Sequence, residues 1–322
     1  MAPDPVNIFE YEEIAKKQLN KGDYDFIAGA ATDEITLRRT REVLDSIIMK
    51  PRMMVDVSQL DLGTTVLGQK ISFPVMLAPA GNHGAAHLEA ELATVRAAGK
   101  ADTLMVLSSH SAKTLEDVAE AATGPIWFQQ YFFKDRELTL GMAARAEEAG
   151  YTALCLTLDA KISPKRERNI RNDYVGPVSP NYAHLDLGTH SWKFAADAPA
   201  SPSDIRDQAT TWTDLEWLAG QTKMPIVVKG IMNPDDAETA LEHGAQGQNL
   251  FSGALAPGPH VLTLELEAQF VHGTVFCAGV VCCFFQQGFG ALGVDITECQ
   301  CCYVHCFGFV GSFAENFSLQ NI

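Results

Sequence analysis

Polar residues stand where a series of apolar segments ends in this sequence. One segment runs into small residues and a turn, at Ala78, Pro79, Ala80 and Gly81. The others end at Ser108, at Gln129 with Tyr131, at Thr157 with Asp159, and at Lys229. Hydroxyl, amide and carboxylate groups can hydrogen-bond a polar ligand, and a lysine can stabilise negative charge on it. A few polar groups on apolar walls are typical of small-molecule sites, so these residues predict one.

Each position also has a purely structural explanation. A lysine after a strand is usually solvated, and Ser108 and Thr157 can simply finish their strands. Asp159 can cap a turn, and Gln129 and Tyr131 share a strand face, where they can form a buried hydrogen-bonded pair. Taken singly, these explanations are favoured. Five consecutive segments that all end in this way favour a site.

The apolar segments alternate with helical patterns. The predicted strands lie at 71–79, 104–109, 126–132, 153–159 and 225–230, and the predicted helices at 88–98, 114–122, 138–149, 214–220 and 235–243. Such alternation predicts a parallel α/β sheet whose strand ends meet at one edge. The first strand lacks the Gly-x-Gly-x-x-Gly of a dinucleotide fold, so we expect a (β/α)8 TIM barrel. Strands six to eight are not recognisable after Gly247, so the predicted barrel is incomplete.

The charge balance excludes some classes of partner. The chain has 322 residues, 24 Lys and Arg against 40 Asp and Glu, and a net charge of −16. Nucleic acids and anionic membranes are bound through clustered basic residues, so neither is expected as a partner. The first residues form no signal peptide and the last four form no peroxisomal signal, so we expect a cytoplasmic protein with reduced thiols.

Six segments carry a resemblance to known proteins. They are Phe73–Pro79, Thr103–Ser109, Phe128–Tyr131, Leu156–Asp159, Lys165–Asn172 and Val227–Ile231. In this order they are similar to the FMN-dependent α-hydroxy-acid oxidases and dehydrogenases, a family that includes glycolate oxidase, lactate oxidase and mandelate dehydrogenase. His83–His87 resembles the lactate oxidase type most. The resemblance covers residues from about 7 to about 247.

The resemblance implies an FMN cofactor at the barrel mouth and the oxidation of a small 2-hydroxy acid, such as lactate or glycolate, to a 2-oxo acid. Oxygen or another acceptor would reoxidise the flavin, and the family commonly forms homo-oligomers. The implied cofactor-binding residues are Ala78, Pro79, Ala80, Ser108, Gln129, Thr157 and Lys229. No metal ion is implied.

The resemblance also implies catalytic roles. Tyr131 would hydrogen-bond the substrate oxygen, and Asp159 would orient the catalytic histidine. Arg166 would help to hold the substrate carboxylate, and Lys229 would stabilise the negative charge of the reduced flavin. Phe26 stands where many members have a tyrosine, so one hydrogen bond to the carboxylate is missing, which bears on substrate choice.

The chain departs from the family after Gly247. The family continues with Ser-Asn-His-Gly-(Gly/Ala)-Arg-Gln, which supplies the base and the carboxylate clamp, whereas this chain reads Gln248–Gly253 and has no Lys or Arg after Lys229. The later loops that hold the FMN phosphate are also missing. A general base contributes about 10²- to 10⁴-fold, so we expect almost no turnover. The alternative is a non-catalytic remnant that interacts with full-length subunits.

Three regions follow from these patterns: a helical cap at 1–70, a partial barrel at 71–247, and a divergent Cys-rich tail at 248–322. Within the tail, 268–294 has no charged residue and is long enough for a membrane helix, but its glycines and its lack of flanking Lys or Arg argue against one. Cys299–Cys306 could bind a metal, although it has no clean Cys-x2-Cys pair. The abrupt change of composition favours loss of the family's reading frame or splice pattern, which would leave an unpaired sheet edge.

Overall fold

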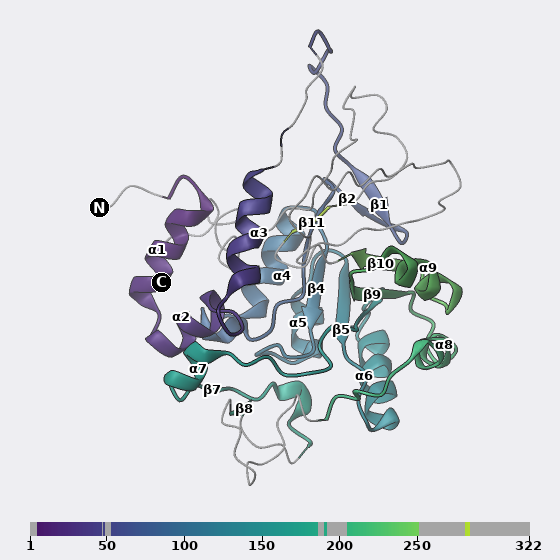
Figure 1. Ribbon diagram of the computed structural model, residues 1–322. Coiled ribbons are helices and arrows are strands. Elements are labelled where there is room, and N and C mark those ends of the chain that lie inside the picture. Colours follow the sequence, from purple (N-terminus) through teal and green to yellow (C-terminus); the bar gives the residue numbers. More distant parts are fainter. Residues whose placement is uncertain are drawn as a thin grey trace.

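The centre of the molecule is one curved β-sheet (Figure 1). The computed structural model describes residues 5–46, 48, 53–185, 190–191, 205–250 and 281–283. The sheet has seven strands in the order β10-β9-β6-β5-β4-β3-β11. Their bounds are β3 Val75–Leu77, β4 Met105–Ser108, β5 Ile126–Gln130, β6 Leu154–Thr157, β9 Ile226–Ile231, β10 Gly247–Leu250 and β11 Val281–Cys283. β11 runs antiparallel to β3, and the other pairs are parallel.

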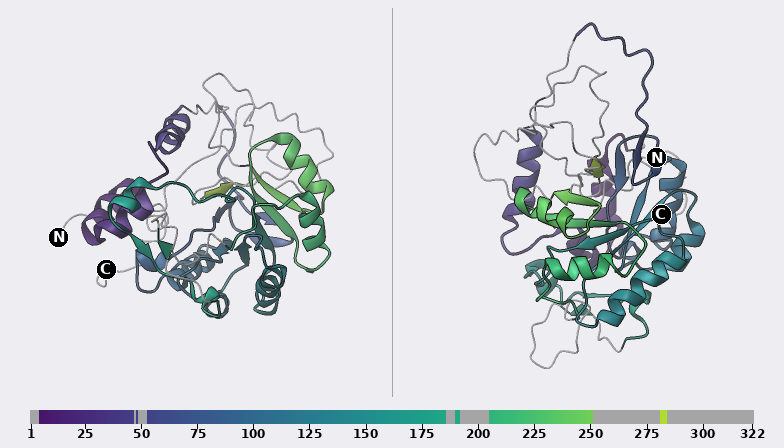
Figure 2. Two further views of the ribbon diagram at one scale, coloured as in Figure 1. Left: turned by 60° about the horizontal axis from the view of Figure 1, so that its bottom comes forward. Right: turned by 90° about the vertical axis from the view of Figure 1, so that its right-hand side faces the viewer.

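Helices lie along the outer side of the curved sheet, as Figure 2 shows. They are α4 Glu91–Lys100, α5 Leu115–Ala121, α6 Arg136–Glu148, α8 Trp212–Ala219 and α9 Pro234–Glu242. Each follows one strand and precedes the next parallel one, which is the βαβ connection. The predicted strands and helices are therefore present in the predicted order, and the fold class, a partial (β/α)8 barrel, is confirmed.

The sheet has two strands more than the five predicted, the parallel β10 and the antiparallel β11. β10 pairs in parallel with β9, with Gly247 opposite Val227 and Gln248 opposite Val228. No sixth strand was recognisable in the sequence, and the prediction that it is missing was wrong. The reason is that β10 contains a single large apolar residue, Leu250, so it lacks the apolar run that marks a buried strand. Its pairing with the edge of β9, rather than its composition, makes it a strand.

The sheet has one apolar cluster on each face. On the outer face, residues such as Leu107, Phe128 and Leu154 pack against the helices. On the inner face, Trp127 and Cys155 belong to a second, smaller cluster. Since successive strand residues point to opposite faces, the alternation fixes which side chains reach the inside of the curved sheet.

Helix ends follow their local sequence signals. The side chain of Thr114 accepts a hydrogen bond from the backbone N–H of Asp117 and so caps α5, which begins at the next residue. Helix α6 is followed by Gly150 at φ +94°, and α9 by Gly244 at φ +96°. Both are left-handed conformations that favour glycine, so each glycine can end the helix that precedes it.

The N-terminal region is helical and packs on the segment after β6. Its helices are α1 Ile8–Gln18, α2 Lys21–Ala28 and α3 Ile35–Asp45, and the segment after β6 contains α7 Glu167–Arg171. Arg168 of α7 forms ion pairs with Glu34 (2.5 Å) and Asp25 (3.7 Å). Burial acts to raise the pKa of Glu34, but the Ala30 N–H and Arg168 together hold that pKa below its usual value. These contacts fix α7 to the N-terminal helices.

Short elements complete the described part of the chain. β1 Thr64–Val66 and β2 Gln69–Ile71 form an antiparallel hairpin, and β7 Val175–Gly176 pairs with β8 His190–Ser191. Two 3₁₀ turns, η1 and η2, lie at His83–Ala85 and Pro180–Tyr182. The stretch from 162 to 202, which follows β6, contains α7, β7, η2 and β8 in its described parts. The boundaries proposed at 70 and 247 remain predictions.

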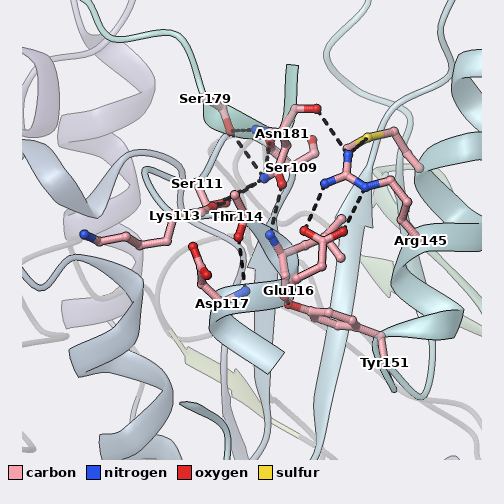
Figure 3. Close-up of polar contacts among 12 residues, drawn as sticks. Ser109, Ser111, Lys113, Thr114, Glu116, Asp117, Arg145, Tyr151, Ser179 and Asn181 are labelled. Atoms are coloured by element: carbon pink, nitrogen blue, oxygen red, sulfur yellow. Dashed lines mark hydrogen bonds and ion pairs between the residues drawn. The ribbon is translucent and has the colours of Figure 1, made fainter. Parts of the chain in front are cut away.

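Asn181 of η2 ties this segment to the start of α5 (Figure 3). Its side chain is fully buried. Its Oδ1 accepts a hydrogen bond from the backbone N–H of Leu115 (2.9 Å), and its Nδ2 donates to Ser111 Oγ (3.0 Å). Arg145 of α6 adds an ion pair with Glu116 (2.9 Å) and a hydrogen bond to the Asn181 carbonyl (3.3 Å). The loop after β6 is therefore held against α5 and α6.

We expect Asn181→Ala to lower the free energy of unfolding by about 1 to 2 kcal/mol, because it leaves a buried backbone N–H without its acceptor. Urea denaturation followed by circular dichroism measures the change. Gln221→Ala, at an exposed position, is the matched control and should change stability by less than about 0.5 kcal/mol. Equal effects of the two substitutions would contradict the role of Asn181.

Two predictions about the tail lie largely outside the described residues. In the described part of the chain, no helix combines the length and the apolar character needed to cross a membrane. Residues 268–294 are described only at β11, and Cys299–Cys306 are not described. Among the described residues, no cluster of three or more His, Cys, Asp or Glu could hold a metal ion.

Candidate functional site

Four of the predicted site residues come together on the inner face, at the carboxyl ends of the strands. Ser108 is in register with Gln129, and Thr157 with Lys229. All four follow the alternation of the inner cluster, since Val106, Trp127, Cys155 and Val227 belong to it two residues earlier on each strand. Four strands therefore present four polar side chains to one concave edge, where parallel α/β proteins bind ligands.

Three of these side chains form a hydrogen-bonded chain. Ser108 Oγ donates to Gln129 Oε1 (3.1 Å), and Gln129 Nε2 donates to Thr157 Oγ1 (2.9 Å). All three residues are buried. The chain uses one of the two N–H groups of Gln129 and the acceptor side of Thr157, so an amide N–H and a hydroxyl proton retain capacity for a ligand. The buried pair that the sequence left open is thus formed by Gln129 with Ser108 and Thr157, not with Tyr131.

Lys229 is held beside Asp159. Its Nζ lies 3.3 Å from Asp159 Oδ1, and the two side chains are 17% and 27% exposed. Burial acts to lower the pKa of Lys229, but Asp159, followed by Tyr131 and Cys155, raises it above the usual value for lysine. The ammonium is therefore positively charged at neutral pH. The structure thus removes the solvated alternative for this lysine.

Gly230 allows this pair to form. It has φ +99°, and a Cβ added there would lie 2.5 Å from Asp159 Cγ. That separation is far inside van der Waals contact, so only glycine fits between β9 and the carboxylate. The backbone N–H of Leu158 also donates to the Lys229 carbonyl (2.9 Å), which fixes the ends of β6 and β9 relative to each other.

Tyr131, just after β5, contacts the imidazole ring of His110 and the planar guanidinium of Arg206. The imidazole of His110 stacks on it with ring centroids 5.3 Å apart. The guanidinium of Arg206 lies 4.5 Å from the centroid of the Tyr131 ring. Arg206 was not predicted as a site residue, because it comes from the polar stretch before α8, outside the strand and helix rhythm. Only the fold brings it to the end of β5.

Arg166 lies against the N-terminal helices. Its Nη2 donates to the backbone carbonyls of Phe26 (2.6 Å) and Gly29 (2.5 Å), and its guanidinium lies 4.9 Å from the centroid of the Phe26 ring. The Phe26 ring also stacks on Tyr174, with centroids 5.1 Å apart. In this structure Arg166 therefore joins the N-terminal helices to the segment after β6, and its role toward a substrate stays a prediction.

A buried carboxylate that the sequence analysis missed organises the loop after β3. Glu91 is fully buried, and its Oε1 accepts from the backbone N–H groups of His83 (2.9 Å) and Ala112 (3.0 Å). It thereby joins the loop that contains Ala78, Pro79 and Ala80 to the loop after β4. Its position in an Ala- and Leu-rich helical pattern gave no sign of this role.

The geometry supports binding of a polar, anionic ligand. A hydrogen-bonding chain, a tyrosine and a charged lysine line one edge of an apolar inner face. The positive charge of Lys229 can stabilise negative charge that develops on the ligand. Asp159 and Lys229 form an ion pair at this edge, whereas Arg166 contacts the N-terminal helices.

The chain is similar in sequence to known proteins of one family. The family model of FMN-dependent dehydrogenases matches residues 15–248. The L-lactate oxidase of Nostoc sp. is 45% identical over 252 residues, which cover 75% of this chain and 68% of that protein. Glycolate oxidase 3 of Arabidopsis thaliana is 40% identical over 245 residues, which cover 75% of this chain and 67% of that protein.

Solved structures agree with this assignment. A soluble mutant of the membrane-associated (S)-mandelate dehydrogenase from Pseudomonas putida superposes with a TM-score of 0.68 and 33% identity, over 76% of this chain and 70% of that one. The family match ends at residue 248, close to where the sequence analysis placed the departure. The resemblance and the cofactor that it implies are thereby confirmed, and the chain belongs to the family of FMN-dependent dehydrogenases.

Proposed function

We propose that this chain binds FMN and a small 2-hydroxy acid at the carboxyl ends of β3, β4, β5, β6 and β9 and catalyses their reaction poorly or not at all. The family supports the FMN-dependent oxidation of 2-hydroxy acids. Lactate and glycolate are the substrates that we infer, because the similar proteins include an L-lactate oxidase and glycolate oxidases. The single observation that carries the proposal is the joint placement of Ser108, Gln129, Thr157 and Lys229 on one inner edge.

The residues present fit the ring of a flavin. A flavin presents carbonyl and nitrogen groups along one edge, and the buried Ser108–Gln129–Thr157 chain keeps an N–H and a hydroxyl for such groups. The loop at Ala78, Pro79 and Ala80 would approach the ring through its backbone. When bound, FMN supplies the acceptor for the two electrons of the 2-hydroxy acid.

The chain's own residues prepare the site for this chemistry. Lys229, charged and held by Asp159, would offset negative charge at the reduced cofactor. Tyr131 would donate a hydrogen bond to the substrate oxygen and so orient it. Asp159 would also accept a hydrogen bond from a base, but its described partner is Lys229. Asp159 is already paired, and it can stabilise a protonated base only if the site contains one.

The proposed lack of turnover follows from the sequence after Gly247. The histidine and arginine expected from the family resemblance are replaced by Gln248–Gly253, and no arginine follows. Without that histidine, the chain lacks the proton acceptor that the family resemblance implies for the substrate hydroxyl. The predicted homo-oligomer and the predicted cytoplasmic location stay predictions.

Flavin titration followed by anaerobic reduction tests the proposal. The purified chain is mixed with FMN, and quenching of flavin fluorescence gives the affinity. We expect saturable binding, and a rate of flavin bleaching by L-lactate or glycolate at least about 10²-fold below that of a full-length lactate oxidase assayed in parallel. Bleaching at a comparable rate would refute the proposed inactivity. Absence of FMN binding would refute the proposed site and favour the non-catalytic alternative.

A further inference from the structure

We propose that Arg206 binds the carboxylate of an organic acid at the barrel mouth, in a subsite built by β5, β6 and the segment before α8. This inference rests on the proposed function, since it names the group that holds the ligand's carboxylate there. The chain has no arginine after Lys229 to bind that carboxylate, and Phe26 has no hydroxyl to do so. Arg206 is a half-buried arginine at the same mouth.

The guanidinium of Arg206 is held in place by two contacts. It lies 4.5 Å from the centroid of the Tyr131 ring, and its Nη1 donates to the Ala160 carbonyl (2.8 Å). Ala160 follows Asp159 directly, so the guanidinium spans the ends of β5 and β6. Stacking on an aromatic ring leaves the edge of a guanidinium open to a carboxylate, which it can bind with two parallel hydrogen bonds.

The backbone of Arg206 is equally fixed. It forms an antiparallel bridge with Phe133. Two backbone hydrogen bonds flank this bridge: the N–H of Lys134 donates to the Ile205 carbonyl (2.8 Å), and the N–H of Asp207 donates to the Phe132 carbonyl (2.9 Å). The neighbouring Asp207 is held by an ion pair with Arg136 (2.8 Å). A group preorganised in this way loses little conformational entropy when a ligand binds.

The charge of Arg206 is not balanced by a carboxylate within the described part of the chain. Arg136 pairs with Asp207 and Asp214, whereas no described carboxylate pairs with Arg206. Asp159, the acidic residue next to Ala160, is paired with Lys229. Nε of Arg206 is buried and has no hydrogen-bond partner. A half-buried guanidinium with an unused donor favours an anionic ligand, because a charge that is partly removed from water is costly without a counter-charge.

The position relative to Tyr131 points to a 2-hydroxy or 2-oxo acid rather than to any anion. Tyr131 lies under the guanidinium and follows β5, whose neighbour β6 pairs with β9 where Thr157 stands opposite Lys229. In a 2-hydroxy acid the carboxylate and the hydroxyl are on adjacent carbons. Arg206 would bind the carboxylate while Tyr131 donates to the neighbouring oxygen.

Calorimetric titration with pyruvate and with its neutral analogue pyruvamide tests this inference, in the presence and in the absence of FMN. We expect the wild-type chain to prefer pyruvate, and Arg206→Leu to bind pyruvate about 10- to 100-fold more weakly with no change for pyruvamide. Arg206→Lys should recover only part of the affinity, because an ammonium lacks the planar fork. Arg171→Leu removes the same charge from a side chain that is 70% exposed and should bind like the wild type.

The outcomes separate this inference from the proposed function. Equal pyruvate affinity of the wild type and Arg206→Leu overturns the role of Arg206, and so does an equal loss of pyruvate and pyruvamide binding, since that marks a structural defect. Absence of pyruvate binding by the wild type under both conditions overturns it as well. Loss of FMN binding alone, with Arg206-dependent pyruvate binding intact, overturns the flavin site and supports the carboxylate subsite.

Discussion

Gly230→Ala lowers the free energy of unfolding by about 2 to 5 kcal/mol, of which about 1 to 2 kcal/mol comes from the left-handed backbone and the rest from overpacking. The added Cβ would meet Cγ, Cβ and Oδ1 of Asp159 at 2.5, 2.6 and 2.7 Å. Either Asp159 or the end of β9 must move, and both movements separate the carboxylate from Lys229. Urea denaturation followed by tryptophan fluorescence measures the loss.

Gly150→Ala is the matched control for the backbone cost. Gly150 has φ +94°, and a Cβ there would meet nothing within 4 Å, so only the conformational penalty applies. A second comparison uses Asp159→Gly, which removes all three clashing atoms. In that background Gly230→Ala should cost no more than Gly150→Ala does in the wild type. An equal cost of Gly230→Ala in both backgrounds would show that the carboxylate is not what excludes the side chain.

Lys229→Met is the second substitution with a large expected effect. It leaves the Asp159 carboxylate, 27% exposed, without its partner, and we expect a loss of stability of about 2 kcal/mol, below the full cost of a broken buried ion pair because of that exposure. In the FMN-loaded protein it also removes the positive charge proposed to lie near the reduced ring. A charged hydrogen bond of about 1.5 to 3 kcal/mol corresponds to a two-electron potential about 30 to 60 mV more negative.

Spectroelectrochemical titration measures that potential, and Lys223→Met is its control. Lys223 is exposed and precedes the opposite end of β9, so the same charge is removed away from the mouth and the potential should not change. An unchanged potential in Lys229→Met would place the lysine away from the flavin. An equal shift of the potential in both variants would show that it comes from the change of net charge and not from the position of Lys229.

The contribution of Lys229 to stability also has a defined pH range. Its pKa in the folded chain is raised above the ordinary lysine value of 10.5. The stabilisation is therefore fully present below that value and is lost as the pH rises through the higher folded value. The difference in stability between the wild type and Lys229→Met should accordingly be constant near neutral pH and shrink only in strongly alkaline solution.

The sequence determined the strands and helices of the barrel and which strand ends carry the residues of the candidate site. Apolar runs such as Ile226–Val228, each followed by a helical pattern, indicate buried parallel strands, because they are too short for a helix and are covered on both faces of the sheet. Parallel strands place their carboxyl ends at one edge. The joint position of Ser108, Gln129 and Lys229 was therefore predictable from spacing alone.

The tertiary structure alone decided the partners of these residues. The pairing of Lys229 with Asp159, the use of Glu91 to join two loops and the stacking of Arg206 on Tyr131 all depend on side chains distant in sequence. The same holds for β10, whose strand character comes from the edge of β9 and not from its own residues. Periodicity reports which face a residue occupies, whereas contacts between loops depend on the closure of the sheet, which no local pattern encodes.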